Sequence, residues 1–150
     1  GSRPILGRPV LKPHTQYYLH SISHSFLTSI YGLFYRNKKQ YITRKALELL
    51  TPTSLLVWYL DDGSLNNHNS ASLFTNAYSL SENNAIQYYF TQKFNIHPVI
   101  CTKIGGNDGE KIYYFLRFRN SDTIKLLDLL STSPIYEYIP DCMRYKFSLT

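Results

Sequence analysis

The sequence has few cysteines and no long apolar run. Two cysteines among 150 residues, Cys101 and Cys142, cannot supply a disulfide framework that holds the fold together, and they favour a reducing compartment. Charged or polar side chains interrupt every leucine-rich run well before the roughly 18 residues that span a bilayer. We therefore expect neither a disulfide-stabilised scaffold nor a membrane partner for this chain.

Acidic residues are also scarce, because 10 Asp and Glu face 16 Lys and Arg and leave a net charge of +6. This surplus suits a polyanion, most simply a nucleic acid, although charge alone does not distinguish such a protein from a basic domain that binds nothing in particular. The 43% of hydrophobic residues can fill one compact core but not two. Fourteen tyrosines and many Asn, Ile and Lys residues resemble the products of AT-rich organellar genomes, so a mitochondrion or chloroplast is the expected location.

Three regions are expected along the chain. Prolines and basic residues make residues 1–15 an extended N-terminal arm. Residues 16–50 should form a strand over 16–24, a helix that begins at Ser25, a basic turn over 36–39, and a short helix over 44–50 that Thr43 caps. Residues 51–150 hold the remaining elements and the candidate chemistry.

The first helix of that third region has clear start and stop signals. Thr51 is placed as its N-cap, Pro52 occupies its first position, and Gly63 follows where a left-handed C-terminal residue is expected. Its body over 55–60 is apolar on every side. We therefore expect this helix to be buried all round, within the domain or against another copy.

Patterning predicts the rest of the fold. After a polar turn over 64–69 we expect a strand over 72–78, a helix capped by Ser81, strands over 98–104 and 111–119 joined by a glycine-rich hairpin loop over 105–109, and a helix capped by Ser121 and Asp122. The order αββαββα, with local connections between strands, predicts an α+β fold. Its antiparallel sheet should carry helices on one face.

Asp61 and Asp62 break a local rule, because two mutually repelling carboxylates stand at the negative end of a helix dipole. Such violations concentrate at functional sites, and oxygen ligands beside an open turn suit a hard cation such as Mg²⁺. The alternative is a polar Asp-Gly turn that merely ends the helix.

The last strand predicts a nucleic-acid surface. Its alternation places cations and aromatic rings on one face and apolar residues on the other, and amide side chains near the preceding hairpin can pair with base edges. An ordinary solvated sheet face would explain the same pattern. The candidate DNA-binding residues are Asn66, Asn67, Asn69, Asn76, Lys103, Lys111, Tyr113, Arg117 and Arg119.

The segment LLVWYLDDGS at 55–64 resembles the signature helix of the LAGLIDADG homing endonucleases, in the branch whose motif ends Trp-Tyr-Met-Asp-Asp-Gly. Segments at 33–39, 73–78 and 139–146 also resemble the end of that family's first repeat and parts of its second. The resemblance implies that Asp62 is a metal-binding catalytic carboxylate and that Lys39 and Lys146 lie around the active centre as catalytic residues. The neighbouring Asp61 either has a structural role or assists Asp62 at the metal. It also implies double-stranded DNA as substrate and Mg²⁺ or another divalent cation as cofactor.

One half of the implied active site is missing from this sequence, because no earlier signature helix with its own acid precedes residue 55. The sequence is then a piece of a longer enzyme, one member of a split enzyme, one subunit of a homodimer, or a chain that has lost cleavage. The alternative function is a non-cleaving RNA-binding maturase, or a component of an organellar RNA-protein particle, that binds intron RNA. A basic interaction module without nucleic acid is the third hypothesis.

Overall fold

The computed structural model describes residues 22–66, 69–105 and 111–149. The predicted arm over 1–15 lies outside these residues, as does the predicted strand up to residue 21. The end of that strand is not formed, because residues 22–24 have no regular structure and His24 instead caps a helix. Its Nδ1 accepts a hydrogen bond of 3.1 Å from the backbone N–H of Phe26 and opens α1 (Ser25–Phe34).

A small hairpin follows α1 where the sequence predicted only a basic turn. Strand β1 (Tyr35–Arg36) pairs antiparallel with β2 (Lys39–Gln40). Asn37 and Lys38 between them have positive φ angles of 52° and 62°, as a type I′ turn requires. The next helix, α2 (Arg44–Glu48), has the predicted cap at Thr43 but ends before residue 50.

Helix α3 (Pro52–Asp62) has the predicted bounds, and the Thr51 side chain accepts a hydrogen bond from the Ser54 N–H. The prediction of a left-handed Gly63 is wrong, since its φ of −92° and ψ of 153° are extended and lead directly into a strand. A residue without a side chain is required at position 63 because a Cβ atom would overlap the ring and the carbonyl oxygen of Tyr59.

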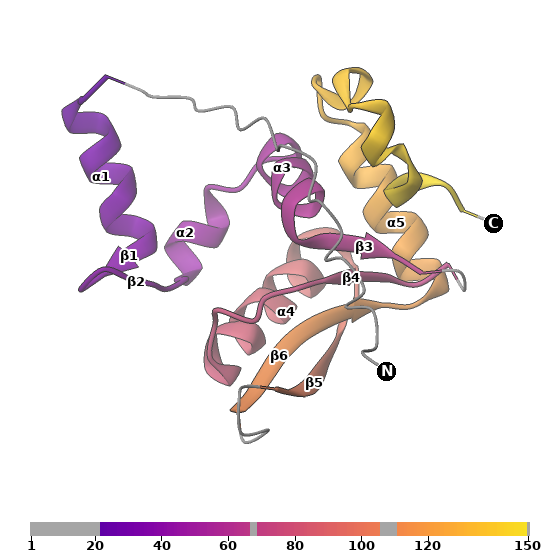
Figure 1. Cartoon of the computed structure of the whole chain (residues 1–150), viewed down its shortest axis with the longest axis horizontal. Helices are drawn as coiled ribbons and strands as arrows, with labels where there is room; N and C mark the ends of the chain where they lie inside the picture. Colours follow the sequence, from indigo (N-terminus) through magenta and orange to yellow (C-terminus); the bar gives the residue numbers. More distant parts are fainter. Residues whose placement is uncertain (1–21, 67–68, 106–110, 150) are drawn as a thin grey trace, which may run out of the picture.

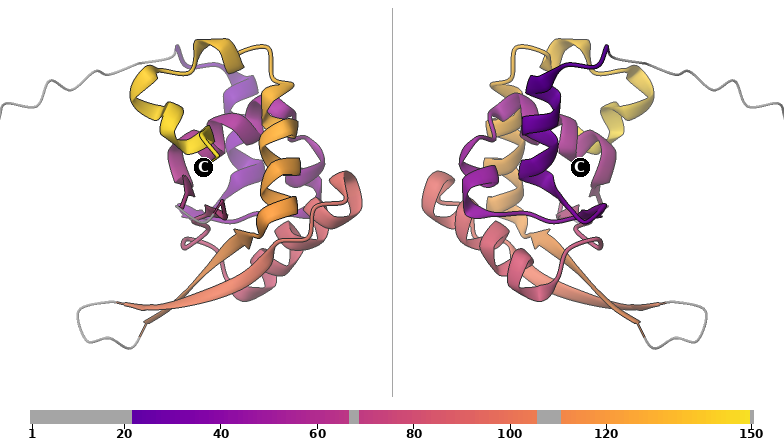
Figure 2. Two further views of the ribbon diagram at one scale, coloured as in Figure 1. Left: turned by 90° about the vertical axis from the view of Figure 1, so that its right-hand side faces the viewer. Right: turned by 90° about the vertical axis from the view of Figure 1, so that its left-hand side faces the viewer.

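Four antiparallel strands form the main sheet in the order β3-β4-β6-β5. They are β3 (Gly63–Leu65), β4 (Ala71–Leu73), β5 (Val99–Gly105) and β6 (Lys111–Phe118), and they alternate with α4 (Leu80–Phe94) and α5 (Asn120–Ser131). The predicted αββαββα order from α3 to α5 is therefore confirmed. Figure 2 shows that the β5–β6 ribbon extends beyond the helices.

Several predicted boundaries were wrong. The expected polar turn contains the end of β3, and the strand expected over 72–78 stops at Leu73. Helix α4 is capped by Ser79 rather than Ser81, and α5 begins at Asn120 without a side-chain cap. The loop residues 106–110 lie outside the described part, although Gly105 pairs with Lys111 beside them as a hairpin requires.

Helices α4 and α5 cover one face of the sheet (Figure 1). The side chains between these layers are buried, and the rings of Phe90 on α4 and Phe118 on β6 meet edge to face at 5.3 Å. The Thr123 hydroxyl on α5 donates to the Phe118 carbonyl and accepts from the Ala71 N–H, which fixes α5 to two strands. The opposite side, called the open face below, carries Ser64, Ser72, Phe74, Cys101, Lys103, Tyr113, Phe115 and Arg117.

Of the two N-terminal helices, α2 packs on α4 with Ala46 and Leu47 in the buried core, whereas α1 is attached less closely. Glu82 on α4 accepts a 3.0 Å hydrogen bond from the Ile42 N–H. This bond joins residues 22–50 to the part of the chain that contains the main sheet. Partial burial raises the pKa of Glu82, but hydrogen bonds from Ser79 and Ile42 outweigh it and hold the pKa below its usual value. No residue of α1 is buried. Figure 1 places α1 at the far end of the molecule from the sheet.

The prediction that α3 is buried on every side is not met within this chain. Leu55, Leu56 and Tyr59 are buried, but the Val57 side chain is 53% exposed. After α5, two short 3₁₀ helices (Tyr136–Tyr138 and Asp141–Phe147) pack the end of the chain near α3. Among the described residues, no helix is both long and apolar enough to cross a membrane.

Candidate active site and nucleic-acid interface

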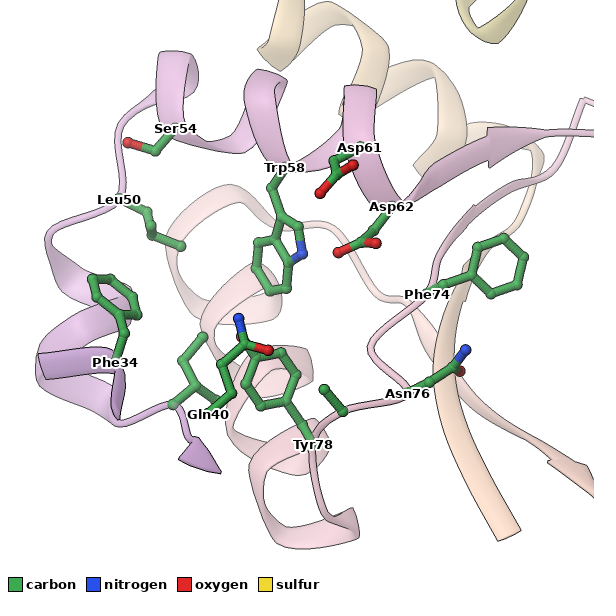
Figure 3. A pocket seen from close by; sticks show the side chains of 12 residues that line it. Phe34, Gln40, Leu50, Ser54, Trp58, Asp61, Asp62, Phe74, Asn76 and Tyr78 are labelled. Carbon is green, nitrogen blue, oxygen red and sulfur yellow. The ribbon is translucent and has the colours of Figure 1, made fainter. Parts of the chain in front are cut away.

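Asp61 and Asp62 line a pocket of about 550 Å³ at the C-terminal end of α3. Trp58 and Ser54 extend along the same helix, and Figure 3 shows the Trp58 indole nitrogen turned toward Asp62. The remaining walls come from the end of α1, from the segment that runs from β2 to α3, and from the segment after β4: Phe34, Gln40, Ile42, Leu50, Phe74, Asn76, Ala77 and Tyr78. The pocket therefore joins the two parts of the chain around one carboxylate pair.

The surroundings of Asp62 disfavour its negative charge. Partial burial, and next the charge of Asp61, raise the pKa of Asp62, while a hydrogen bond from the Trp58 side chain and the charge of Lys146 lower it without cancelling the rise. The helix dipole acts in the same direction as Asp61. A cation at this carboxylate would relieve the repulsion.

The residues at the pocket partly fit a magnesium ion. Asp61 and Asp62 supply carboxylate oxygens, the ligands that Mg²⁺ prefers, and Asn76 and Gln40 add amide oxygens to the walls. Within the described residues no three His, Cys, Asp or Glu side chains gather into a metal-binding group. If a metal ion binds here, the pair supplies only part of its ligand set, and water, phosphate oxygens or a second chain would have to contribute the rest.

The structure brings Lys146 beside the end of α3. Its side chain is only 7% exposed, and its Nζ donates a 2.7 Å hydrogen bond to the carbonyl of Leu60. Its own carbonyl accepts from the Tyr59 hydroxyl at 3.1 Å, and burial raises the pKa of Tyr59. A cation at the C-terminal end of a helix complements the helix dipole, so Lys146 offsets part of the charge on the Asp pair.

Lys39 is placed differently from Lys146. It is exposed on β2 and its charge acts on Glu82, whereas its neighbour Gln40 lines the pocket. The structure does not bring Lys39 into the pocket with Asp62, and its catalytic role remains a prediction. Sequence reasoning missed Gln40 and Trp58, although the spacing of Trp58 four residues before Asp62 indicates a shared helix face.

The candidate DNA-binding side chains fall into two groups. Lys103 and Tyr113 are paired across β5 and β6, Lys111 Nζ lies 4.9 Å from the centre of the Tyr113 ring, and Arg117 is on the same face. Arg119 is exposed and directly follows β6. Within the described residues these cations form no ion pair, because the three ion pairs observed there involve His97, Asp122, Lys125, Asp141 and Arg144.

Asn66 and Asn69 lie at the edge of the sheet that β3 forms, whereas Asn76 lies in the segment that follows β4. Asn76 lines the Asp62 pocket. Asn66 and Asn69 flank the β3–β4 turn, where the Asn66 side chain accepts a 3.0 Å hydrogen bond from the Ser70 N–H and Asn69 has a positive φ of 53°. The Asn66 side chain therefore stabilises the turn, and DNA binding by these asparagines stays a prediction. Asn67 lies outside the described residues.

Comparison with known proteins matches the model of the LAGLIDADG DNA endonuclease family to residues 7–126. No match is found among curated proteins. The fold is similar to a solved structure, the homing endonuclease I-WcaI bound to its DNA recognition sequence, with a TM-score of 0.69 and 22% identity. That alignment covers 87% of this chain and 55% of the other, so the chain spans about half of that protein. Because the family match extends over most of the sequence, this chain belongs to the LAGLIDADG DNA endonuclease family.

Proposed function

We propose that this chain forms half of a homing endonuclease that binds double-stranded DNA on its open face and hydrolyses phosphodiester bonds with Asp62. One observation carries the proposal: Asp62 stands at the end of α3 beside a sheet face whose cations have no carboxylate partners within the described residues. Lys and Arg on such a face neutralise phosphates, while the adjacent carboxylate can bind a metal at one of them. We also propose an organellar, intron-encoded origin, which the composition favours.

The side chains around Asp62 have distinct parts in this reaction. A bound Mg²⁺ would supply an activated water and offset charge on the phosphate. Asp62 and Asp61 would hold it, and the Trp58 hydrogen bond fixes the orientation of the Asp62 carboxylate. Lys146 lowers the cost of keeping Asp62 ionised before the cation binds.

Replacing Arg117 and Arg119 together with alanine should weaken duplex binding about tenfold or more. The slope of the logarithm of the binding constant against the logarithm of the salt concentration should fall by about two, because binding releases about one counterion fewer for each phosphate contact that is lost. The fold should persist, since both side chains are exposed. A double Lys45→Ala, Lys125→Ala variant has the same net charge but loses cations from the helices α2 and α5, and it should bind nearly as the parent does. Equal losses of duplex affinity in both variants, at all salt concentrations, would refute the assignment of the open face.

Tighter binding of the parent chain to structured intron RNA than to duplex DNA would support the maturase alternative.

The second carboxylate should come from another signature helix packed against α3. Val57 provides an exposed apolar position on that helix. The exposed apolar side chains of α1, which include Phe26 at 64% and Tyr31 at 49%, favour a complementary half over a second copy. A second copy covers the apolar side of its sheet with its own α4 and α5, so the only sheet face that it leaves uncovered is the open face that DNA would occupy.

Val57→Lys should reduce assembly with the partner half at least tenfold, because a buried unpaired ammonium is costly in a helix–helix contact. The isolated chain should melt within about 1 °C of the parent, since Val57 is half exposed. Sedimentation measures assembly, with and without duplex DNA. Val57→Ala is the matched control and should assemble almost normally. If the lysine variant retained the mass of the parent assembly, α3 would not be the contact.

A further inference from the structure

The open face is organised in rows across the four strands, and the row that contains Asp62 differs from its neighbours. The registers pair Ser64 with Ser72, Ser72 with Arg117, and Arg117 with Val99 in one row. A second row pairs Tyr113 with Lys103. Hydroxyl, guanidinium and ammonium groups dominate both rows, which can hydrogen-bond to phosphates and to base edges.

The row between them begins at Asp62 and is otherwise apolar. The Phe74 N–H donates a 2.9 Å hydrogen bond to the Asp62 carbonyl, so these residues stand opposite each other at the start of the β3–β4 ladder. The rings of Phe74 and Phe115 lie 5.6 Å apart, and Phe115 pairs with Cys101 on β5. Apart from the carboxylate and a weakly polar thiol, this row offers a base no hydrogen-bonding side chain.

The Phe74 ring is accessible rather than packed away. Its side chain is 40% exposed, and it lines the pocket that contains Asp61 and Asp62. Figure 3 shows its ring directed away from Trp58 and Tyr78, toward the sheet. The ring packs on that of Phe115 and lies at the surface beside Asp62, where a ligand on the open face would contact it.

We propose that Phe74, supported by Phe115, reads the C5-methyl group of a thymine next to the cleaved phosphate. This inference rests on the proposed function, because it places duplex DNA on the open face. In the major groove only thymine presents a methyl group, and phenylalanine is one of the side chains that contact it. Neighbouring strands are about 4.8 Å apart and base pairs about 3.4 Å, so the contacted thymine lies within about three base pairs of the phosphate at Asp62.

Uracil in place of thymine tests this contact, because it removes the methyl group and leaves every hydrogen bond of the base pair. Selection from randomised duplexes first identifies the sequence that this chain prefers, and each thymine in it is then replaced by uracil in turn. One replacement should weaken binding of the parent about fourfold, the value of one buried methyl group. Phe74→Ala should bind the thymine and uracil duplexes equally. Tyr88→Ala removes another half-exposed ring, on α4, and should retain the parent's discrimination.

The outcomes separate the inference from the function on which it rests. Equal binding of all thymine and uracil duplexes by the parent, or a preferred sequence without any thymine, overturns the inference while duplex binding through Arg117 stands. Discrimination that persists in Phe74→Ala with a parent-like melting temperature also overturns it. Failure of the parent to bind any duplex removes the proposed function itself, and the inference with it.

Discussion

Replacing Asp62 with asparagine should abolish metal-dependent cleavage of duplex DNA, by at least about a hundredfold, while the protein becomes as stable as before or slightly more stable. Partial burial and then Asp61 raise the pKa of Asp62 above its unfolded value. The carboxyl group therefore favours the folded state only when protonated, at low pH, and that contribution is lost as the pH rises through the folded pKa. At neutral pH the ionised group opposes folding, and asparagine removes this opposition. Because the side chain is exposed to solvent, the gain should be a few tenths up to about 1 kcal/mol.

The two effects are measured side by side. Thermal melting at pH 7 and at pH 3 reports stability, and nicking of a duplex in Mg²⁺ reports cleavage by an assembly that includes the second carboxylate. The stability gain should shrink at pH 3, where the parent carboxyl is also neutral. Asp128→Asn removes another exposed carboxylate from the last turn of a helix, α5, and should leave cleavage unchanged. A variant that cuts as fast as the parent would show that Asp62 does not bind the catalytic metal.

Local signals were sufficient to predict α3. Thr51 and Pro52 act through hydrogen bonds and torsion angles within one helical turn, so a sequence reader can evaluate them without knowing the fold. The same holds for the αββαββα order, which follows from hydrophobic periods of two and 3.6 residues. Where a cap is ambiguous the signal weakens: Ser79 and Ser81 are both good N-caps, and Glu82 three residues after Ser79 decides between them.

Contacts between distant segments were not predictable in this way. Gln40 enters the pocket and Lys39 does not because the two-residue turn at Asn37 and Lys38 fixes the register of the hairpin. Lys146 could be placed near the active centre only through the family resemblance, since its hydrogen bond to Leu60 spans 86 positions. The alternation of β6 predicted which side chains share the open face. It did not predict that Phe74 and Phe115 share a row with Asp62, because that depends on the pairing of three strands.

Gly63 shows how a correct residue preference can have a different cause. The sequence predicted a glycine with positive φ, yet its φ of −92° is accessible to any residue. Glycine is required because a Cβ would collide with the Tyr59 carbonyl oxygen and ring. The carbonyl belongs to the last turn of α3 and accepts the Gly63 N–H. The ring is held by Phe147, at 5.5 Å between centroids, and by the hydroxyl bond to Lys146. Neither can withdraw without disturbing the helix end that carries Asp62.

Gly63→Ala should therefore destabilise the protein by about 2–4 kcal/mol, which lowers the melting temperature by roughly 5–15 °C. Cleavage should fall as well, because relief of the collision displaces Asp62. Stability and activity thus decline together, whereas in Asp62→Asn only activity declines. Gly32→Ala is the matched control: Gly32 is in the last turn of α1 and nothing lies within 4 Å of the added Cβ, so alanine should leave the melting temperature unchanged or raise it. Differential scanning calorimetry of both variants measures the contrast. A Gly63→Ala protein that melts with the parent would mean that the α3–β3 junction is looser than the contact with Tyr59 indicates.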